Sequence, residues 1–301
     1  MEHASIMNKK RRVSDQLLEA LIYLCAFLAV GLLLGIIGYV FWRGFRTVNW
    51  SFLVTEQSPT KGIMGIAGNI VNTLYIVVLT LLAATPIGVG GAIYLNEYAK
   101  PGKFVSLVQF TIETLTGIPS IIFGLFGNVF FGKIFGYSML TGALTLTIMV
   151  LPLIARNTQE ALRTVPDSYR SGALGIGATK WYMIRTILLP SAMPGILTGV
   201  ILAIGRIVGE SAALLFTAGS GYYLPKGGMG LFRKLFESGG TMTIELYLQM
   251  AKGKYDVAFG IACVLLALVL LLNLLTKYLA GRLNVENRKY REKTCRIVKS
   301  A

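Results

Sequence analysis

Charged residues inside long apolar runs are the first candidates for chemistry in this chain. Arg206 and Glu210 stand four residues apart in the run ILTGVILAIGRIVGESAALLFTAG, which places them on one face if the run is helical. A charge at the centre of a membrane helix costs about 2.5–3.5 kcal/mol on insertion scales, so such residues face a bundle interior, a cavity or a partner. A guanidinium offers a planar fork of donors that matches an oxyanion. The pair indicates an anion pathway, with a buried structural ion pair as the alternative.

Two further charged residues border apolar runs. Arg156 follows LPLIA near the end of one run, and Glu113 lies in TIETLTGIPSIIFGLFG near the start of another. We expect both to line the pathway. The alternatives are an arginine that snorkels to the membrane surface and a glutamate that hydrogen-bonds to threonine or backbone. Pro119, flanked by small residues, predicts a kink after Glu113.

Several kinds of chemistry are excluded by the residue inventory. The single histidine is His3, and the cysteines are Cys25, Cys263 and Cys295, without a CxxC pair. Neither a metal-ligand cluster nor a Ser/His/Asp triad can be assembled from this set, and no disulfide framework follows. The sequence also lacks the G-x4-G-K-[ST] phosphate loop of ATP-binding proteins. We therefore expect a conduit without metal, cofactor or catalytic site, driven by a partner.

The composition specifies the elements that hold these residues. Of 301 residues, 54% are hydrophobic and 14% are charged, against about 25% charged in a soluble domain. An all-α integral membrane protein is expected, because the alternating pattern of a β-barrel is absent. The first apolar run is too long for a signal-peptide core and is expected to remain as an anchor. Six membrane helices are predicted over about 17–42, 68–95, 104–131, 138–159, 186–218 and 255–280.

Basic residues indicate the orientation in the bilayer. With the N-terminus inside, 19 Lys and Arg fall on the inner side and 9 on the outer side, so both termini are predicted to be cytoplasmic. The net charge of +15 then reflects topology, and no nucleic-acid partner is expected. Two long loops, 43–67 and 219–254, fall outside. The second has amphipathic pieces near 231–236 and 244–250, which either rest on lipid headgroups or meet an external partner.

A glycine-broken polar segment, 164–190, joins the fourth and fifth runs on the cytoplasmic side. Thr164 and Asp167 have the spacing of a capping box and predict a helix start. Glycines at 175 and 177 predict its end, because glycine accepts the left-handed conformation. Thr179 is placed to cap a second helix. The shape suits an elbow that another protein grips, and an ordinary interfacial loop is the alternative.

The spacing G-x9-I-x-L-P, from Gly177 to Pro190, resembles the cytoplasmic EAA loop of the membrane subunits of ABC importers. Over about residues 62–280 the chain is similar to phosphate-specific transport (Pst) permeases of the PstA type. The segments that carry this resemblance are GAIYLNEYA, ETLTGIPSIIFGLFG, LPLIARNTQEALRTVPDSYRSGALGIGATKW and AIGRIVGESAALLFTAG. The resemblance implies the type I ABC importer (MetI-like) fold, with six transmembrane helices and a cytoplasmic coupling helix.

The resemblance also implies roles for particular residues. Those that match Arg156, Arg206 and Glu210 are important for transport in the family. Where the family often has Glu-Ala-Ala, this chain has Ser171-Gly172-Ala173; the absent acid puts one docking contact in question but not the fold. The loop that docks on the ATPase would be formed by Asp167, Tyr169, Arg170, Ser171, Gly172, Ala173, Gly177, Lys180 and Pro190.

The implied function is that of a membrane subunit in an ATP-driven importer of inorganic phosphate. Its partners would be a second, homologous permease, two cytoplasmic ATP-binding subunits that hydrolyse ATP, and an external phosphate-binding protein, in a bacterial or archaeal cytoplasmic membrane. One alternative is an importer of sulfate, molybdate or a phosphonate. Another is an ion-coupled carrier with Glu113 and Glu210 as proton sites, although such carriers usually show internal repeats and none is evident here.

The expected organisation is one membrane domain with basic ends. Residues 1–16 form a basic cytoplasmic N-terminus, and residues 17–61 the first helix and an external loop. The permease domain covers 62–280, including the loop 164–190, and a basic cytoplasmic tail follows over 281–301.

Overall fold

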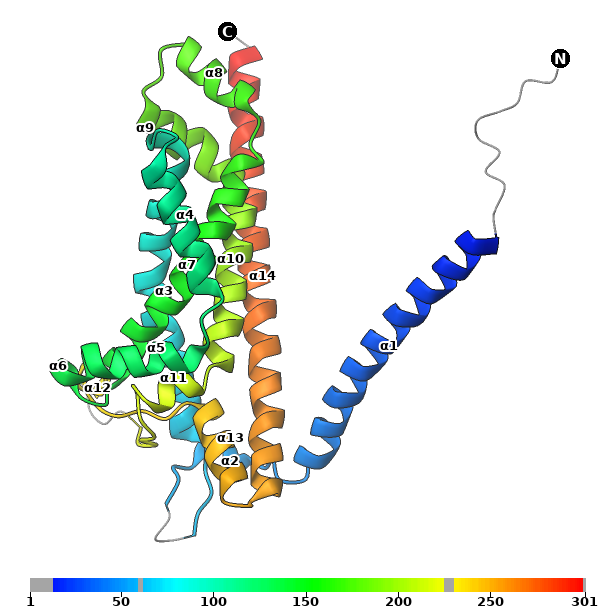
Figure 1. The fold of residues 1–301 in the computed structure, drawn as a ribbon, viewed down its shortest axis with the longest axis vertical. Coiled ribbons are helices and arrows are strands. Elements are labelled where there is room, and N and C mark those ends of the chain that lie inside the picture. The colour runs from blue at the N-terminus through cyan, green and yellow to red at the C-terminus, as the bar shows by residue number, and fades with distance from the viewer. Residues whose placement is uncertain (1–12, 59–61, 225–229, 300–301) are drawn as a thin grey trace.

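The computed structural model describes residues 13–58, 62–224 and 230–299, and these form a helical bundle (Figure 1). Five of its helices are long and apolar enough to cross a membrane, and a bent helix pair makes a sixth span if it is counted as one. Strand-type pairing in the described part is limited to a single bridge between Ser58 and Ile63. The main spans are α1 (Val13–Gly44), α3 (Ala67–Ile93), α7 (Met139–Arg163), α10 (Leu189–Gly209) and α14 (Tyr255–Lys299).

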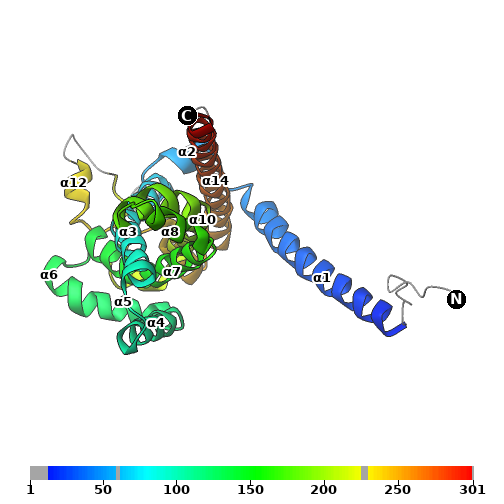
Figure 2. The same cartoon turned by 90° about the horizontal axis from the view of Figure 1, so that it is seen from above.

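The centre of the bundle is α7, packed between α3 and α10 (Figure 2). Two thirds of the most apolar window of α7 is buried, more than in any other span of the described chain. Small residues permit this close approach. A Cβ at Gly88 of α3 would lie 2.9 Å from Ile154 of α7, and one at Gly199 of α10 would lie 2.7 Å from Asn157. The side chains of α7 are therefore held on two sides.

The predicted third helix, 104–131, is not one helix. It is α4 (Lys103–Thr116) followed by α5 (Ser120–Gly127), with a bend of 104° between the two halves. Pro119 stands at the break with extended-type backbone, φ −57° and ψ 137°. Proline has no N–H to donate and disfavours the α conformation of the residue before it. The expected kink is therefore a full break, and η3 (Asn128–Gly132) and α6 (Lys133–Phe135) continue the second half.

The predicted fifth helix, 186–218, also differs from the structure. Its helical path starts earlier, with α9 (Lys180–Met183) and the π turn η4 (Ile184–Leu188), and runs into α10. It ends at Gly209, because Glu210 is extended, with φ −81° and ψ 124°. The short α11 (Ala212–Leu215) follows.

The first span, α1, leads away from the rest of the bundle (Figures 1 and 2). None of its most apolar window is buried within the chain. It is held at its C-terminal end, where the Arg43 guanidinium lies 5.4 Å from the Phe259 ring centroid of α14. Tyr39 meets the same ring edge-on at 5.6 Å.

The two ends of the bundle carry different elements (Figure 1). The short helix α8 (Asp167–Gly175) lies at one end. The short helices α2 (Trp50–Val54), α12 (Gly230–Lys234) and α13 (Met242–Ala251) lie at the other. On α13 the residues Met242, Ile244 and Glu245 are buried against the protein. Protein, rather than lipid headgroups, therefore covers that face of the amphipathic piece predicted near 244–250.

Candidate functional site

The segment between α7 and α10 forms the predicted elbow, and a glycine ends its first helix. At the end of α8, Ala178 N donates to Ala173 O over 3.1 Å and Gly177 N to Leu174 O over 3.0 Å. These two bonds form a Schellman motif, which requires a left-handed residue. Gly177 supplies it with φ of 82°. The bend predicted from the glycines is confirmed.

The second arm of the elbow begins as predicted. Thr179 is the N-cap of α9, and its Oγ1 accepts a hydrogen bond from Tyr182 N at 3.3 Å. The chain then passes through η4 into α10, with Pro190 in the first turn. The π turn comes directly before this proline, and its last hydrogen bond runs from Leu189 N to Ile184 O.

The start of α8 differs from the prediction. The helix begins after Pro166, which provides no side-chain cap. Thr164 instead ends α7, and its Oγ1 donates to Ala161 O over 2.8 Å. The capping box predicted between Thr164 and Asp167 is therefore wrong. Asp167 lies in the first turn, where a negative charge suits the helix dipole, and its Oδ1 accepts a bond of 2.9 Å from Arg170 Nη1.

The elbow has one buried side and one exposed apolar side. Ala173 is buried in a cluster with residues of α7, α9 and η4. On the other side Leu174 is 51% exposed and Ile176 is 86% exposed. Exposed apolar surface of this kind is typical of sites that contact another protein or a membrane. Also exposed are Tyr169, Ser171, Gly172, Lys180, Trp181 and Tyr182.

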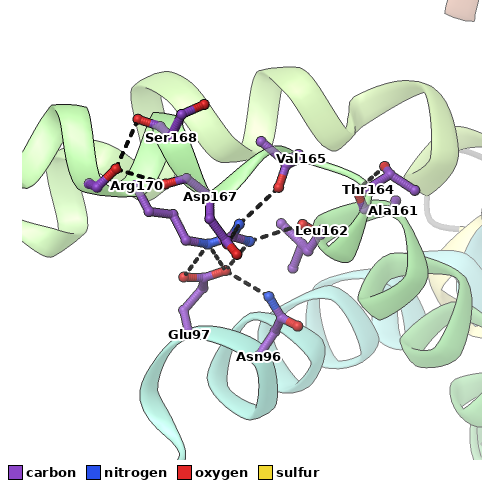
Figure 3. A network of polar contacts seen from close by, with 10 residues as sticks. Asn96, Glu97, Ala161, Leu162, Thr164, Val165, Asp167, Ser168 and Arg170 are labelled. Carbon is purple, nitrogen blue, oxygen red and sulfur yellow. Dashed lines mark hydrogen bonds and ion pairs between the residues drawn. The ribbon is translucent and has the colours of Figure 1, made fainter.

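Arg170 holds the elbow to the bundle through a residue that the sequence reasoning missed, Glu97. It belongs to the π turn η2 (Tyr94–Tyr98), which directly continues α3. Arg170 Nη2 donates to Glu97 Oε1 over 2.9 Å, and its Nε lies 3.3 and 3.4 Å from the two carboxylate oxygens. The Glu97 side chain is 5% exposed and that of Arg170 is 19% exposed. Figure 3 shows the guanidinium lying over the carboxylate.

The same guanidinium also binds two backbone carbonyls. Nη2 donates to Leu162 O over 3.0 Å and Nη1 to Val165 O over 2.9 Å, so the end of α7 and the turn after it are held together (Figure 3). The hydrogen bond to Glu97 raises the pKa of Arg170, as do the charges of Glu97 and Asp167, and burial opposes them. The one signal for this network in the sequence is that an acid, Glu97, follows a long apolar run.

Arg156 and Glu113 are brought together at one cavity between α4 and α7. The cavity has a volume of about 110 Å³ and is lined by Gln109, Ile112, Glu113, Arg156, Gln159, Glu160 and Arg163. Arg156 Nε pairs with Glu160 Oε1 at 3.1 Å, and its Nη groups make no hydrogen bond to the described residues. Gln159 is 93% buried, and its amide likewise has no partner among the described residues. The cavity therefore holds unused hydrogen-bond donors.

Arg206 and Glu210 do not form the expected pair. Because α10 ends at Gly209, the two residues do not share a helical face. Glu210 is 9% exposed, and its Oε1 accepts a bond of 3.1 Å from Ala213 N at the start of α11. Arg206 is exposed and has no ion pair or hydrogen bond with the described residues.

The two arginines lie at different depths of the bundle. Gly199 packs against Asn157, the residue after Arg156. Arg206 is seven residues further along α10, which is about 10 Å at 1.5 Å per residue. Arg156 is seven residues from the end of α7 that leads into the elbow, whereas Arg206 is three residues from the end of α10 that leads into α11. The structure does not join the four predicted pathway residues into a single site.

With this fold and elbow established, comparison with known proteins defines the class. Residues 84–285 match the family described as the binding-protein-dependent transport system inner membrane component. The match covers two thirds of the chain, so the chain belongs to this family of multi-pass ABC transporter permeases.

Individual relatives show which permeases within this family the chain is similar to. The chain is 38% identical over 211 residues to the probable ABC transporter permease protein YqgI of Bacillus subtilis, covering 69% of this chain and 72% of the relative. It is 33% identical over 269 residues to the phosphate transport system permease protein PstA 2 of Mycobacterium bovis, covering 87% and 86%. The resemblance to PstA-type permeases is thereby confirmed.

Solved structures show the same fold. A bacterial alginate ABC transporter in complex with an alginate-bound periplasmic protein matches with a TM-score of 0.67 at 17% identity, over 90% of this chain and 96% of that one. The methionine transporter MetNI, in inward-facing conformations, matches with a TM-score of 0.52 at 21% identity, over 74% and 94%. The expected type I importer fold is confirmed.

Proposed function

We propose that this chain is one membrane-spanning subunit of an ATP-driven importer of inorganic phosphate. The observation that carries the proposal is its likeness, over most of its length, to permeases named for phosphate transport. The elbow and the arginine-lined cavity supply the physical parts that such a subunit needs.

The elbow supports a role in receiving force from an ATPase. Its exposed tip is apolar at Leu174 and Ile176, while Arg170 and Ala173 hold its other side to α7 and η2. A partner that binds the tip can therefore move the bundle. The chain has no phosphate loop of its own, so ATP hydrolysis belongs to separate subunits.

The cavity beside Arg156 supports an anionic cargo. Arg156 donates only its Nε to Glu160, and a guanidinium has five N–H donors. The remaining donors, with the amide of Gln159, are placed to bind an oxyanion at the cytoplasmic half of the path. Arg206 would meet the anion first, about 10 Å further along the helix axis. Transport would follow alternating access, with the elbow moving the cavity-lining helices.

The proposed partners follow from the same role. A second, homologous permease would complete the pathway in a heterodimer, two ATP-binding subunits would occupy the cytoplasmic side, and an external binding protein would deliver phosphate. We propose in addition that both termini are cytoplasmic in a bacterial or archaeal membrane; the excess of Lys and Arg on that side of the predicted spans supports the orientation.

Uptake of labelled phosphate into vesicles that contain the complete complex tests the cargo. Unlabelled phosphate should compete, whereas sulfate, molybdate and a phosphonate should not. Selective competition by one of those anions would identify that anion as the cargo in place of phosphate. Uptake that persists without the ATP-binding subunits would favour an ion-coupled carrier instead.

A further inference from the structure

Both arms of the elbow contact the same five-residue turn at the end of α3. The first arm reaches it through Arg170, which binds Glu97. The second arm reaches it through Lys180, whose Nζ lies 4.9 Å from the centroid of the Tyr98 ring. Glu97 and Tyr98 are neighbours in η2. Two contacts of different chemistry, from opposite sides of the Gly177 bend, thus converge on one short segment.

The receiving segment has an unusual backbone. Residues Tyr94–Tyr98 form a π turn. This turn continues α3 without a break and is the last turn of that helical span. Turns of this kind are uncommon within α-helices and are frequent at functional sites. A second π turn, η4, stands where the elbow joins α10. Of the three helices that meet the elbow, α3 and α10 therefore have widened backbone at the junction, and α7 remains α-helical to Arg163.

The chain already links α8 to α7 and α9 to α10 by short connections. The helix α3 has no such covalent link to the elbow, although it packs along α7 through much of its length. Its mechanical connection to the elbow consists of the Glu97 and Tyr98 contacts, together with apolar packing by Val89 and Ile93. Of these, the Glu97–Arg170 pair is directional and buried, with the carboxylate 5% exposed.

We propose that Glu97 is a positioning residue that fastens the elbow to α3, so that force applied to the elbow moves α3, α7 and α10 as one unit. The inference rests on the proposed function and goes beyond it, because it names the helix and the contact that carry the motion. Glu97 binds Arg170 and is not among the residues that line the cavity beside Arg156. Its effect is exerted through Arg170, which also holds the carbonyls of Leu162 and Val165.

The Glu97→Gln variant in the complete, reconstituted complex tests the proposal. Glutamine keeps the size and one acceptor, but the bond from Arg170 loses its second charge. Ion-assisted hydrogen bonds exceed neutral ones by about 1 kcal/mol, or about fivefold. We expect stimulation of ATP hydrolysis by the loaded binding protein, and phosphate uptake, to fall by about that factor, while the ATP-binding subunits remain bound. The matched control is Lys103→Gln, at an exposed position of α4 without an ion pair or hydrogen bond to the described part of the chain.

Three outcomes would contradict the role. Wild-type stimulation and uptake in Glu97→Gln would show that the contact transmits nothing. Loss of the bound ATP-binding subunits would show that the pair is merely structural. Uptake that falls without any loss of stimulation would place Glu97 on the cargo path. If the wild-type complex itself lacks stimulation, the proposed function fails instead, so the two failures are distinguishable.

A distance measurement tests the same idea without disturbing the pair. Spin labels would be attached at Ser168→Cys on α8 and Tyr94→Cys on η2, in a chain with its natural cysteines replaced by serine. Both positions are exposed. We expect the distance between these labels to stay constant between nucleotide-free and ATP-bound complexes. A reference pair from Ser168→Cys to Phe104→Cys on α4 should change. A change in the first pair equal to that in the second would overturn the proposal.

Discussion

Replacement of Glu210 tests whether its side chain pairs with Arg206 or instead accepts the N–H of Ala213. If α10 continued through 210, Glu210 would pair with Arg206 one turn below. In the structure the carboxylate instead accepts the Ala213 N–H at 3.1 Å and caps α11. Its backbone carbonyl accepts a bond of 2.9 Å from Thr243 Oγ1, which any side-chain replacement retains. The Glu210→Ala variant therefore removes the cap and little else from this junction.

The expected loss of stability in Glu210→Ala comes from one buried donor, the N–H of Ala213. Loss of a helix cap costs about 1 kcal/mol, and a buried amide left without an acceptor costs about 1–3 kcal/mol. The two values describe the same bond, so we expect Glu210→Ala to lower the free energy of unfolding by about 1–3 kcal/mol. Glu210→Gln retains an oxygen acceptor at the same reach, and should lower it by less than about 1 kcal/mol.

A double-mutant cycle measures the coupling energy between Arg206 and Glu210. Residues without contact add within about 0.5 kcal/mol, whereas contacting pairs couple by about 0.5–3 kcal/mol. Unfolding of the purified complex in mixed micelles would be measured for Arg206→Gln, Glu210→Ala and the double variant. We expect additivity, because Arg206 makes no bond to Glu210. A coupling energy above about 1 kcal/mol would refute the reasoning and restore the helical pair.

Three further predictions follow from single positions. Arg206→Gln should abolish phosphate uptake while the complex still assembles. Arg206→Lys should retain little uptake, because an ammonium lacks the planar fork of donors. Wild-type uptake in Arg206→Gln would show that Arg206 is not part of the pathway. Gly177→Ala should cost about 1–2 kcal/mol in thermal unfolding, because φ of 82° disfavours a side chain. The helical control Gly172→Ala should instead stabilise by about 0.5–1 kcal/mol. Burial lowers the pKa of Lys234. Between that lowered pKa and the ordinary lysine value of 10.5, the unfolded chain binds more protons than the folded chain, so the free energy of unfolding should rise with pH. The Lys234→Met variant should lose that rise.

Hydropathy and glycine spacing predicted the parts of the fold that are local. Five spans and the Gly177 bend follow from apolar length and from a backbone angle that glycine tolerates. The break at Pro119 was predicted only as a kink, because its angle depends on what α5 packs against, and α5 lies on α7 and α11. The capping box at Thr164 failed because Thr164 still has helical backbone as the C-cap of α7, and α8 begins only after Pro166.

The candidate site was predicted less completely. Arg156 and Glu113 were chosen as isolated charges, and their meeting at one cavity depends on how α4 crosses α7. The spacing of Arg206 and Glu210 fits a helix, but the chain turns at Gly209 so that Glu210 can satisfy Ala213 N–H. Glu97 is 73 residues from Arg170 in the sequence, and its partner cannot be inferred from spacing alone.

Stimulation of ATP hydrolysis by the phosphate-loaded binding protein tests the central claim most directly. Coupling between two sites is reciprocal, so an elbow that transmits force inward must also report the external ligand to the ATPase. The complete complex in vesicles should hydrolyse ATP faster with loaded binding protein than with empty binding protein. The same rate with loaded, empty or absent binding protein would contradict the account.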